Sequence, residues 1–209
     1  GFIWENQIRE KVFGLSPEKN DTNIHDIDKS KNEMSGYTEN ISIKTTGSDT
    51  ICCGDICRFY NYNFEEKNML IVIKYKQNND VKVIIRIYEI DYNKKLHEKL
   101  FGNCPFDEIE NYSKSIKSIP HGEASPEVKK KYKEDKNILQ NKYNLLIRIN
   151  PKVDSKTQRR VQCSIPNFED LLKVHIVSQS DPENPNVVRG KTIDRAINSS
   201  RRVRNNATT

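Results

Sequence analysis

The strongest constraint on the fold comes from two apolar, β-branched runs, at residues 69–76 and 81–88. The polar residues between them, Gln-Asn-Asn-Asp, predict a β-hairpin. Successive side chains of a strand point to opposite faces, yet Leu70 and Ile71, on opposite faces of the first run, are both apolar. We therefore expect this run to be a central strand that is covered on both sides.

The sequence also predicts helices that could cover such a strand. Trp4, Ile8 and Val12 recur at helical spacing and predict a first helix. Ser125 followed by Pro126 is a typical helix start, because serine caps the first turn and proline fits it. The expected elements are helices at 2–13, 106–115 and from 126 onward, and strands at 23–28, 40–46, 145–150, 159–165 and 171–178. They predict an α/β fold with a central mixed β-sheet flanked by helices.

The chain is basic and contains few apolar residues. It has 35 Lys and Arg against 29 Asp and Glu, a net charge of +6, and only 34% hydrophobic residues. A basic balance favours polyanionic partners. No apolar run approaches the roughly 18 residues that a membrane span requires, and the first residues lack a signal-peptide pattern. We expect an intracellular protein with no membrane partner.

Several classes of site are disfavoured by the residues themselves. An odd number of cysteines, five, argues against a disulfide framework, and their spacing is not that of a zinc site. The four histidines have no metal-ligand spacing with one another. No glycine-rich phosphate loop occurs, so no nucleotide cofactor is expected. The cysteines are Cys52, Cys53, Cys57, Cys104 and Cys163, and the histidines are His25, His97, His121 and His175.

Acids and a lysine fall on neighbouring strand-like segments between residues 23 and 59. Asp26 and Asp28 share a face of the first segment, because side chains alternate along a strand. Ser42 and Lys44 share a face of the second segment. These acids and the lysine are expected to converge beside a small sheet, which is either a solvated sheet face or a metal-dependent active site.

The chemistry that fits such a convergence is phosphodiester hydrolysis. It needs a divalent metal to neutralise developing charge, together with a positioned water. Magnesium prefers oxygen ligands, often one or two carboxylates plus water and phosphate. A neighbouring lysine orients the water and offsets negative charge in the transition state. The 18 positions between Asp26 and Lys44 leave room for a strand, a turn and a returning strand.

This arrangement resembles the core of the PD-(D/E)xK nuclease superfamily, and within it the type II restriction endonucleases. The resemblance is carried by Asp26 in Ile-His-Asp-Ile-Asp, by Lys44 in Ser-Ile-Lys-Thr-Thr and by Glu5 on the preceding helix. It implies a restriction-endonuclease-like fold, Mg²⁺ as cofactor, double-stranded DNA as substrate, a homodimer, and the cytoplasm of a bacterial or virus-infected cell. It also implies that Asp26 and Asp55 bind metal, that Lys44 positions the water, and that Glu5 assists.

The sequence departs from the motif at two positions. His25, rather than proline, precedes Asp26, and Ser42 stands where the motif has an acid. Some restriction enzymes of the superfamily have a Ser-x-Lys element and take the second carboxylate from further along the chain, for which Asp55 is the first candidate. The alternatives are Asp49 or Glu39 for that carboxylate, Asp28 for the first-strand ligand, and a shifted site that pairs Asp55 with Lys74.

Basic segments in the second half are expected to contact DNA. Lysine and arginine bind phosphates, whereas Arg, Gln and Asn also read base edges. The predicted hairpin at 145–165 and the basic end of the chain combine these residue types. The expected DNA-binding residues are Lys152, Lys156, Arg159, Arg160, Gln162, Arg201, Arg202 and Arg204. We thus expect one domain over 1–209, with the catalytic core in 1–90 and DNA-contacting elements in 125–209.

Two other classes of function remain open. One is a non-enzymatic, basic nucleic-acid-binding protein whose acids lie on a solvated or capping face. The other is an interaction domain whose basic tail contacts another protein or a membrane surface. Metal-dependent cutting of plasmid DNA separates the nuclease from both.

Overall fold

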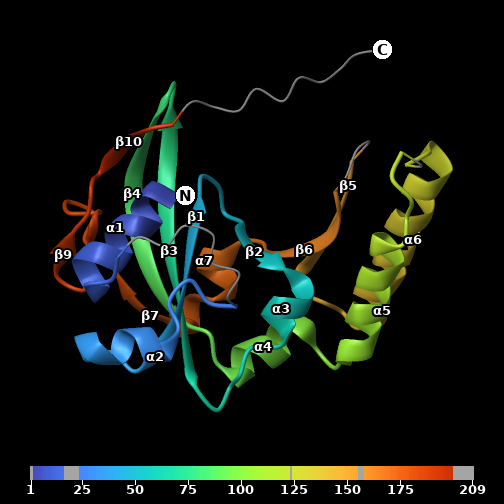
Figure 1. Cartoon of the computed structure of the whole chain (residues 1–209), viewed down its shortest axis with the longest axis horizontal. Helices are drawn as coiled ribbons and strands as arrows, with labels where there is room; N and C mark the ends of the chain where they lie inside the picture. Colours follow the sequence, from blue (N-terminus) through green and yellow to red (C-terminus); the bar gives the residue numbers. More distant parts are fainter. Residues whose placement is uncertain (1, 17–23, 123, 155–157, 200–209) are drawn as a thin grey trace.

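The computed structural model describes residues 2–16, 24–122, 124–154 and 158–199, which form a mixed α/β structure (Figure 1). Its main sheet is curled and mixed, with five strands in the order β1–β3–β4–β10 and with β7 also paired to β4. A three-stranded sheet has the order β2–β6–β5, and β8 pairs with β9. The predicted class, a mixed sheet flanked by helices, is confirmed at this level.

The elements follow one another in the order that Figure 1 labels. Their bounds are α1 Phe2–Phe13, α2 Lys29–Asn32, the 3-10 helix η1 Glu33–Ser35, β1 Glu39–Thr46, β2 Ile51–Asp55, α3 Ile56–Tyr60, β3 Lys67–Asn78, β4 Val81–Asp91, α4 Lys94–Phe101, α5 Phe106–Lys117, α6 Pro126–Lys142, β5 Arg148–Val153, β6 Arg159–Ile165, α7 Phe168–Leu171, the 3-10 helix η2 Lys173–His175, β7 Ile176–Gln179, β8 Val187–Val188, β9 Lys191–Thr192 and β10 Ala196–Asn198.

Strand β3 is the centre of the main sheet, as its two apolar faces predict. It pairs in parallel with β1 and antiparallel with β4, so the predicted hairpin is confirmed. Its turn contains Asn79 at φ 51°, a left-handed conformation that asparagine tolerates better than most residues. Residues 69–73 are buried, with at most 2% of each residue exposed, because layers of structure cover both faces of the strand.

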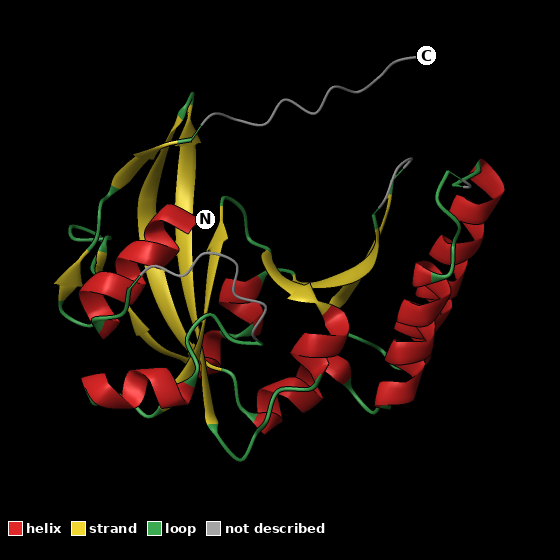
Figure 2. Cartoon of the chain, in the orientation of Figure 1, coloured by secondary structure: helices red, strands yellow, loops and turns green. Residues whose placement is uncertain are grey.

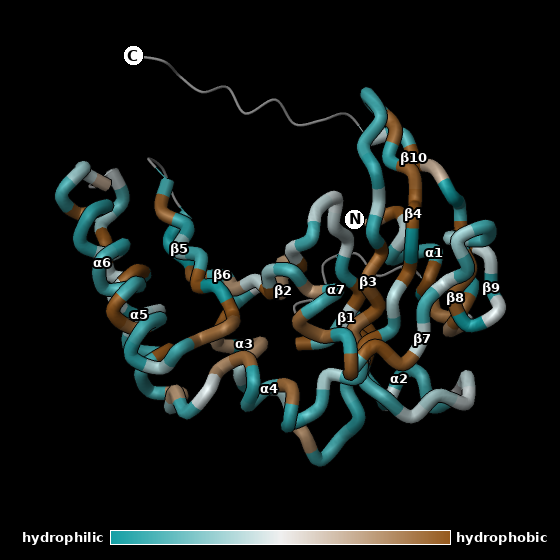
Figure 3. The backbone as a smooth tube through the Cα atoms, turned by 180° about the vertical axis from the view of Figure 1, so that it is seen from behind, coloured by the Kyte–Doolittle hydropathy of each residue, from teal (hydrophilic) through white to brown (hydrophobic). Residues whose placement is uncertain are grey.

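Two hydrophobic clusters lie on the two faces of the main sheet. Helix α1 covers one face, where Trp4 and Ile8 pack with Ile41 and other apolar residues of the sheet. On the opposite face, Leu70 joins a larger cluster that includes residues of β2, β6 and helices α3 to α6. In Figure 3 the hydrophobic residues accordingly concentrate along the central strands. The helix predicted at 2–13 is confirmed with those bounds.

The smaller sheet β2–β6–β5 is a curved strip that links the main sheet to helices α5 and α6 (Figure 2). Ile149, Val161 and Cys163 are buried on its helix-facing side. Helix α6 begins after Ser125, whose hydroxyl accepts the backbone N–H of Val128 at 3.3 Å, so the predicted capped start is confirmed.

The strand predictions at 171–178 and 23–28 are largely wrong. Residues 168–175 form α7 and the 3-10 helix η2, and only Ile176–Gln179 is a strand. Short apolar runs do not distinguish a buried strand from a buried helical turn. The segment around Asp26 is reduced to a single antiparallel bridge between Ile27 and Ile41. None of the described helices is long and apolar enough to cross a membrane.

Candidate active site

Asp26 is held against the free edge of β1 by the backbone itself. Ile27 and Ile41 exchange both backbone hydrogen bonds, at 3.0 and 2.8 Å. Two residues further along β1, the backbone N–H of Ile43 also points away from the sheet. It donates to Oδ2 of Asp26 at 2.5 Å, so the carboxylate takes the place of a neighbouring strand. Arg9 of α1 donates to the backbone carbonyl of Asp26 from the other side. The carboxylate is therefore fixed in position while 27% of the side chain stays exposed.

Lys44 points from β1 to the same carboxylate. Its Nζ lies 3.1 Å from Asp26 Oδ2, and only 19% of the side chain is exposed. Burial lowers the pKa of Lys44, but the negative charge of Asp26 and the hydrogen bond to its carboxylate outweigh burial, so the pKa is raised overall. The ammonium group therefore stays protonated at neutral pH. It is suited to electrostatic stabilisation rather than to accepting a proton.

Glu5, in the first turn of α1, is a second carboxylate in the electrostatic field of this pair. Burial raises the pKa of Glu5, the negative charge of Asp26 raises it further, and Lys44 and Arg9 only partly oppose the shift. Two carboxylates in one another's field, one of them half-buried, make ionisation of both unfavourable. A cation between them would relieve that cost.

Beneath Lys44, Ser42 is part of a buried polar network. Only 1% of Ser42 is exposed, and its hydroxyl lies 2.8 Å from the Tyr62 hydroxyl and 3.5 Å from Nδ1 of His25. Burial raises the pKa of Tyr62 to about 12, and burial lowers the pKa of His25, so both are neutral near pH 7. This face of β1 is therefore not solvated, and Ser42 supports the site instead of supplying a ligand.

The donor set fits a magnesium ion with few protein ligands. Asp26 Oδ1 accepts no hydrogen bond from the described residues, and Glu5 is the second carboxylate in its field. Magnesium commonly takes one or two protein carboxylates and completes its shell with water and phosphate. No group of three or more His, Cys, Asp or Glu suited to a metal occurs in the part of the chain that the structure describes. The site thus offers two carboxylates and no closed cage.

The alternative acids lie elsewhere. Asp55 ends β2 and caps α3, with Oδ1 accepting the N–H of Arg58 at 3.0 Å. Asp28 precedes α2, and Glu39 pairs with Arg189 and Lys67. Among the described residues, no hydrogen bond or ion pair joins Asp55 to Asp26 or Lys44. Asp55 therefore has a capping contact, whereas Glu5 lies near enough to Asp26 and Lys44 for their charges to shift its pKa.

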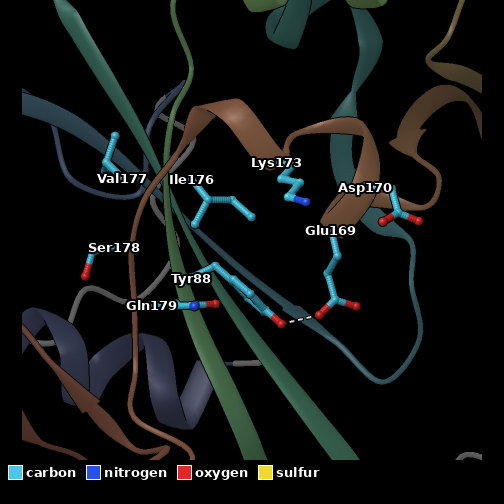
Figure 4. Close-up of a pocket in the computed structure, with 8 residues that line it drawn as sticks. All are labelled: Tyr88, Glu169, Asp170, Lys173, Ile176, Val177, Ser178 and Gln179. Atoms are coloured by element: carbon cyan, nitrogen blue, oxygen red, sulfur yellow. Dashed lines mark hydrogen bonds between the residues drawn. The ribbon is translucent and has the colours of Figure 1, made fainter.

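A second acid–lysine cluster lies on the same face of the main sheet. Lys74 is two residues beyond Val72, the register partner of Lys44, and its Nζ lies 2.8 Å from Asp49 Oδ1. Lys74 also pairs with Glu169, which in turn accepts a hydrogen bond from Tyr88. Figure 4 shows Tyr88 and Glu169 pointing toward one another at the wall of a cavity of about 700 Å³. These contacts tie α7 to β3 and β4, and they leave the proposed partner of Lys74, Asp55, out of the cluster.

The expected DNA-binding residues are divided by the structure. Lys152, Arg160 and Gln162 lie on one face of the β5–β6 hairpin. Arg159 lies on the other face, and only 4% of its side chain is exposed, because its guanidinium donates to the carbonyls of Ile119, Pro120, Asp154 and Gln158. These contacts tie Arg159 to the fold, and its expected role in binding DNA stays a prediction. Lys156, Arg201, Arg202 and Arg204 lie outside the described residues.

Sequence reasoning missed three contributors to these clusters. Arg9 follows Glu5 by four positions on α1, and this helical spacing is a signal that could have placed both on one side. Tyr62 and Glu169 reach their partners from distant parts of the chain, so no local pattern indicates them.

Comparisons with family models, curated proteins and solved structures found no match to this chain.

Proposed function

We propose that the protein is a magnesium-dependent endonuclease that hydrolyses phosphodiester bonds of double-stranded DNA, as a type II site-specific deoxyribonuclease does. The observation that carries the proposal is the 3.1 Å pair of Lys44 and Asp26 at the edge of the main sheet, with Glu5 in the same field. An acid, a second acid and a protonated lysine are the side chains that metal-assisted phosphodiester hydrolysis uses.

In this proposal each side chain has a distinct role. Asp26 and Glu5 would hold the ion, which would neutralise charge on the phosphate and activate a water. Lys44, as an ammonium, orients that water and faces the negative charge that develops on the phosphate oxygens. Hydrolysis forms a bond from the water oxygen to phosphorus and breaks one ester P–O bond; the water gives up a proton to the solvent, and the leaving oxygen takes one up.

The order of elements also supports a restriction-endonuclease-like core. The acid segment follows a helix and bridges antiparallel to β1, the strand that carries Lys44. The chain then passes through β2 and α3 before β3 returns parallel to β1. A homodimer is part of the same proposal, because a twofold enzyme matches a palindromic target. Sedimentation velocity of the full chain tests it, and a monomer at every concentration would remove it.

A matched pair of acid variants tests the proposal. Supercoiled plasmid is incubated with the wild-type protein and Mg²⁺, with EDTA as the metal-free control. Asp26→Asn is expected to abolish cutting, whereas Asp55→Asn is expected to cut normally, because asparagine preserves the helix cap without the charge. An intact plasmid with wild-type protein over broad conditions contradicts the nuclease proposal. Loss of cutting in Asp55→Asn instead makes Asp55 a ligand.

The second candidate is a basic nucleic-acid-binding protein without activity. It is favoured by the lysine–carboxylate pairing itself, since Lys44 and Asp26 already satisfy one another as a structural ion pair. Duplex binding without any metal-dependent cutting is the result that supports it.

A further inference from the structure

Strands β5 and β6 place six polar residues on one face of their hairpin. Directly opposed residues of an antiparallel pair share a face, and the register joins Arg148 to Ser164, Asn150 to Gln162 and Lys152 to Arg160. We call these six residues the ribbon face. The opposite face, with Ile149, Val161 and Cys163, is buried. The hairpin is thus strongly two-sided, with its apolar side packed against helices.

The cations of the ribbon face have no side-chain partner among the residues that the structure describes. The side chains of Arg148, Lys152 and Arg160 form no hydrogen bond or ion pair with any described residue, and neither does the amide of Gln162. In contrast, the Arg159 guanidinium on the opposite face donates hydrogen bonds to four backbone carbonyls. Three unpaired positive charges and a free amide on one face point to a ligand that carries both negative charge and hydrogen-bonding edges.

None of the six residues of the ribbon face is acidic, and Asp55 is the acid of β2 that shares this face. The nearest carboxylate in register is Asp55 of β2, opposite Gln162, and it is engaged as the cap of α3. Asn150 is partly satisfied, since its Nδ2 donates to Ser164 Oγ at 2.8 Å. The face therefore presents a net charge of +3 from its own residues, Arg148, Lys152 and Arg160, around one free amide and one partly engaged amide.

The hairpin has the width that a duplex groove admits. Strand β2 pairs with β6 as far as Gln162, so the ribbon face is three-stranded there and becomes a two-stranded ribbon only at its Lys152–Arg160 end. Its strands are about 4.8 Å apart, and the major groove of B-DNA, about 12 Å wide, admits a two-stranded β-ribbon. In Figure 2 the helices lie on the other side of the curved strip, so they do not cover this face.

The ribbon face is also connected to the Asp26–Lys44 pair. Strand β1, which carries Lys44, contacts β2, and only residues 47–50 separate the two strands in the chain. A polyanion that lies along the ribbon is therefore directed toward the edge of the main sheet where Lys44 lies.

We propose that the ribbon face enters the major groove of double-stranded DNA, with Arg148, Lys152 and Arg160 on phosphates and Gln162 at base edges. This proposal rests on the proposed function only for what happens to the bound DNA afterwards. A duplex is favoured over a single strand because the ribbon face has no aromatic side chain on which bases could stack. It is favoured over duplex RNA because the major groove of A-form RNA is too deep and narrow for side chains to read.

Binding measured without metal tests the proposal independently of cutting. Fluorescence anisotropy with a duplex DNA pool is recorded over a series of salt concentrations in EDTA. The triple variant Arg148→Ala, Lys152→Ala and Arg160→Ala is expected to weaken binding at least about tenfold. It should also reduce the slope of log K against log salt by about 3, since each lost phosphate contact removes roughly 0.9. The matched control replaces Lys129, Lys131 and Lys133, exposed lysines of α6, by alanine.

Each outcome has a defined meaning. Wild-type binding by the ribbon variant, equal weakening by the α6 control, or tighter binding of the same sequence as a single strand or as duplex RNA overturns the proposal. Weakened duplex binding together with a plasmid that the wild type never cuts leaves the ribbon intact and removes the nuclease. Cutting that depends on Lys44, combined with unchanged binding of the ribbon variant, removes only the ribbon.

Gln162 is the residue that we expect to determine the DNA sequence preference. After selection of a preferred duplex from a random pool, Gln162→Ala is expected to lose about tenfold in preference for that duplex, because one good bidentate base contact discriminates by about this factor. Its affinity for the unselected pool should change less than about threefold. An unchanged preference excludes Gln162 from base reading.

Discussion

At the scale of single residues, the Asp26 site combines three side chains in unequal electrostatic situations. Lys44 is stabilised as a cation by Asp26 and stays charged. Glu5, which is half-buried and close to Asp26, is destabilised as an anion, and its pKa is raised first by burial and then by Asp26. Ionisation of Glu5 is unfavourable in the free protein, and a bound cation would offset this cost. Cation binding would therefore stabilise the folded protein.

The raised pKa of Glu5 gives a prediction about stability and pH. In the folded protein Glu5 holds its proton to a higher pH than in the unfolded chain, so its contribution favours folding at low pH and is lost as pH rises through the folded pKa. Glu5→Gln is therefore expected to unfold at a higher temperature than wild type at pH 7 without metal, with the difference vanishing below about pH 4, near the reference pKa of glutamate.

The measurement is thermal unfolding at several pH values with and without Mg²⁺. Added Mg²⁺ is expected to stabilise the wild type, because a ligand of the native state raises stability by mass action. It should stabilise Glu5→Gln clearly less. A variant that is less stable than wild type at pH 7, or one that responds equally to Mg²⁺, contradicts the role given to Glu5.

At the scale of elements, local patterns predict those helices and strands whose apolar residues repeat over many positions. Helix α1 and the β3–β4 hairpin are of this kind, and the sequence predicts both. The run at 171–178 is too short for its period to distinguish a strand from helical turns. The lysine–acid pair is predictable because Asp26 and Lys44 lie on adjacent segments. Glu169 is not, because tertiary folding brings it to Lys74 from 95 positions away.

Neighbouring arginines on β6 show what a strand period can and cannot predict. Side chains alternate between the two faces of a strand, so Arg159 and Arg160 must point in opposite directions. This alternation does not indicate which of the two side chains points toward the helices. Arg159 faces them and is held by four carbonyls, two of which belong to residues 119 and 120 before α6. Arg160 is exposed. The two residues should therefore differ in stability and binding.

Arg159→Ala is expected to lower the free energy of unfolding by about 1–3 kcal/mol, because it removes hydrogen bonds from a charged donor to four carbonyls, two of them in part-buried contacts. Arg160→Ala should change it by less than about 0.5 kcal/mol, as surface substitutions usually do, while weakening duplex binding. Urea denaturation and duplex anisotropy of the two variants measure both effects. Equal stability losses would mean that Arg159 is not an anchor of the hairpin.

At the scale of the whole molecule, buried histidines make the stability of the folded protein depend on pH. His97 packs among aromatic rings, including Tyr60 and Phe101, and burial lowers its pKa to about 4. The pKa of His25 and that of His175 are also lowered by burial. In the unfolded chain these histidines take up a proton near about pH 6.5, whereas in the folded protein they resist it. The fold therefore loses stability as pH falls.

For His97 the expected loss is up to roughly 3 kcal/mol between about pH 6.5 and about pH 4, because a pKa lower by one in the folded protein corresponds to about 1.4 kcal/mol. The neutral variant His97→Gln is expected to be less stable at pH 7 but to lose clearly less stability on acidification. Urea midpoints from pH 7 to pH 4 test this. Parallel curves for wild type and variant would show that His97 does not set the acid response.

We expect Lys44 to stabilise the transition state of phosphodiester hydrolysis. Another lysine that lies on a strand beside acids is not expected to do so. Lys74 is the matched control, since it lies on the same face of the neighbouring strand and pairs with two carboxylates. The decisive measurement is the single-turnover rate of plasmid cutting in Mg²⁺ by Lys44→Ala and Lys74→Ala, both verified as folded. We predict a loss of at least about 100-fold for Lys44→Ala and less than about threefold for Lys74→Ala. Equal rates in the two variants would contradict a catalytic role for Lys44.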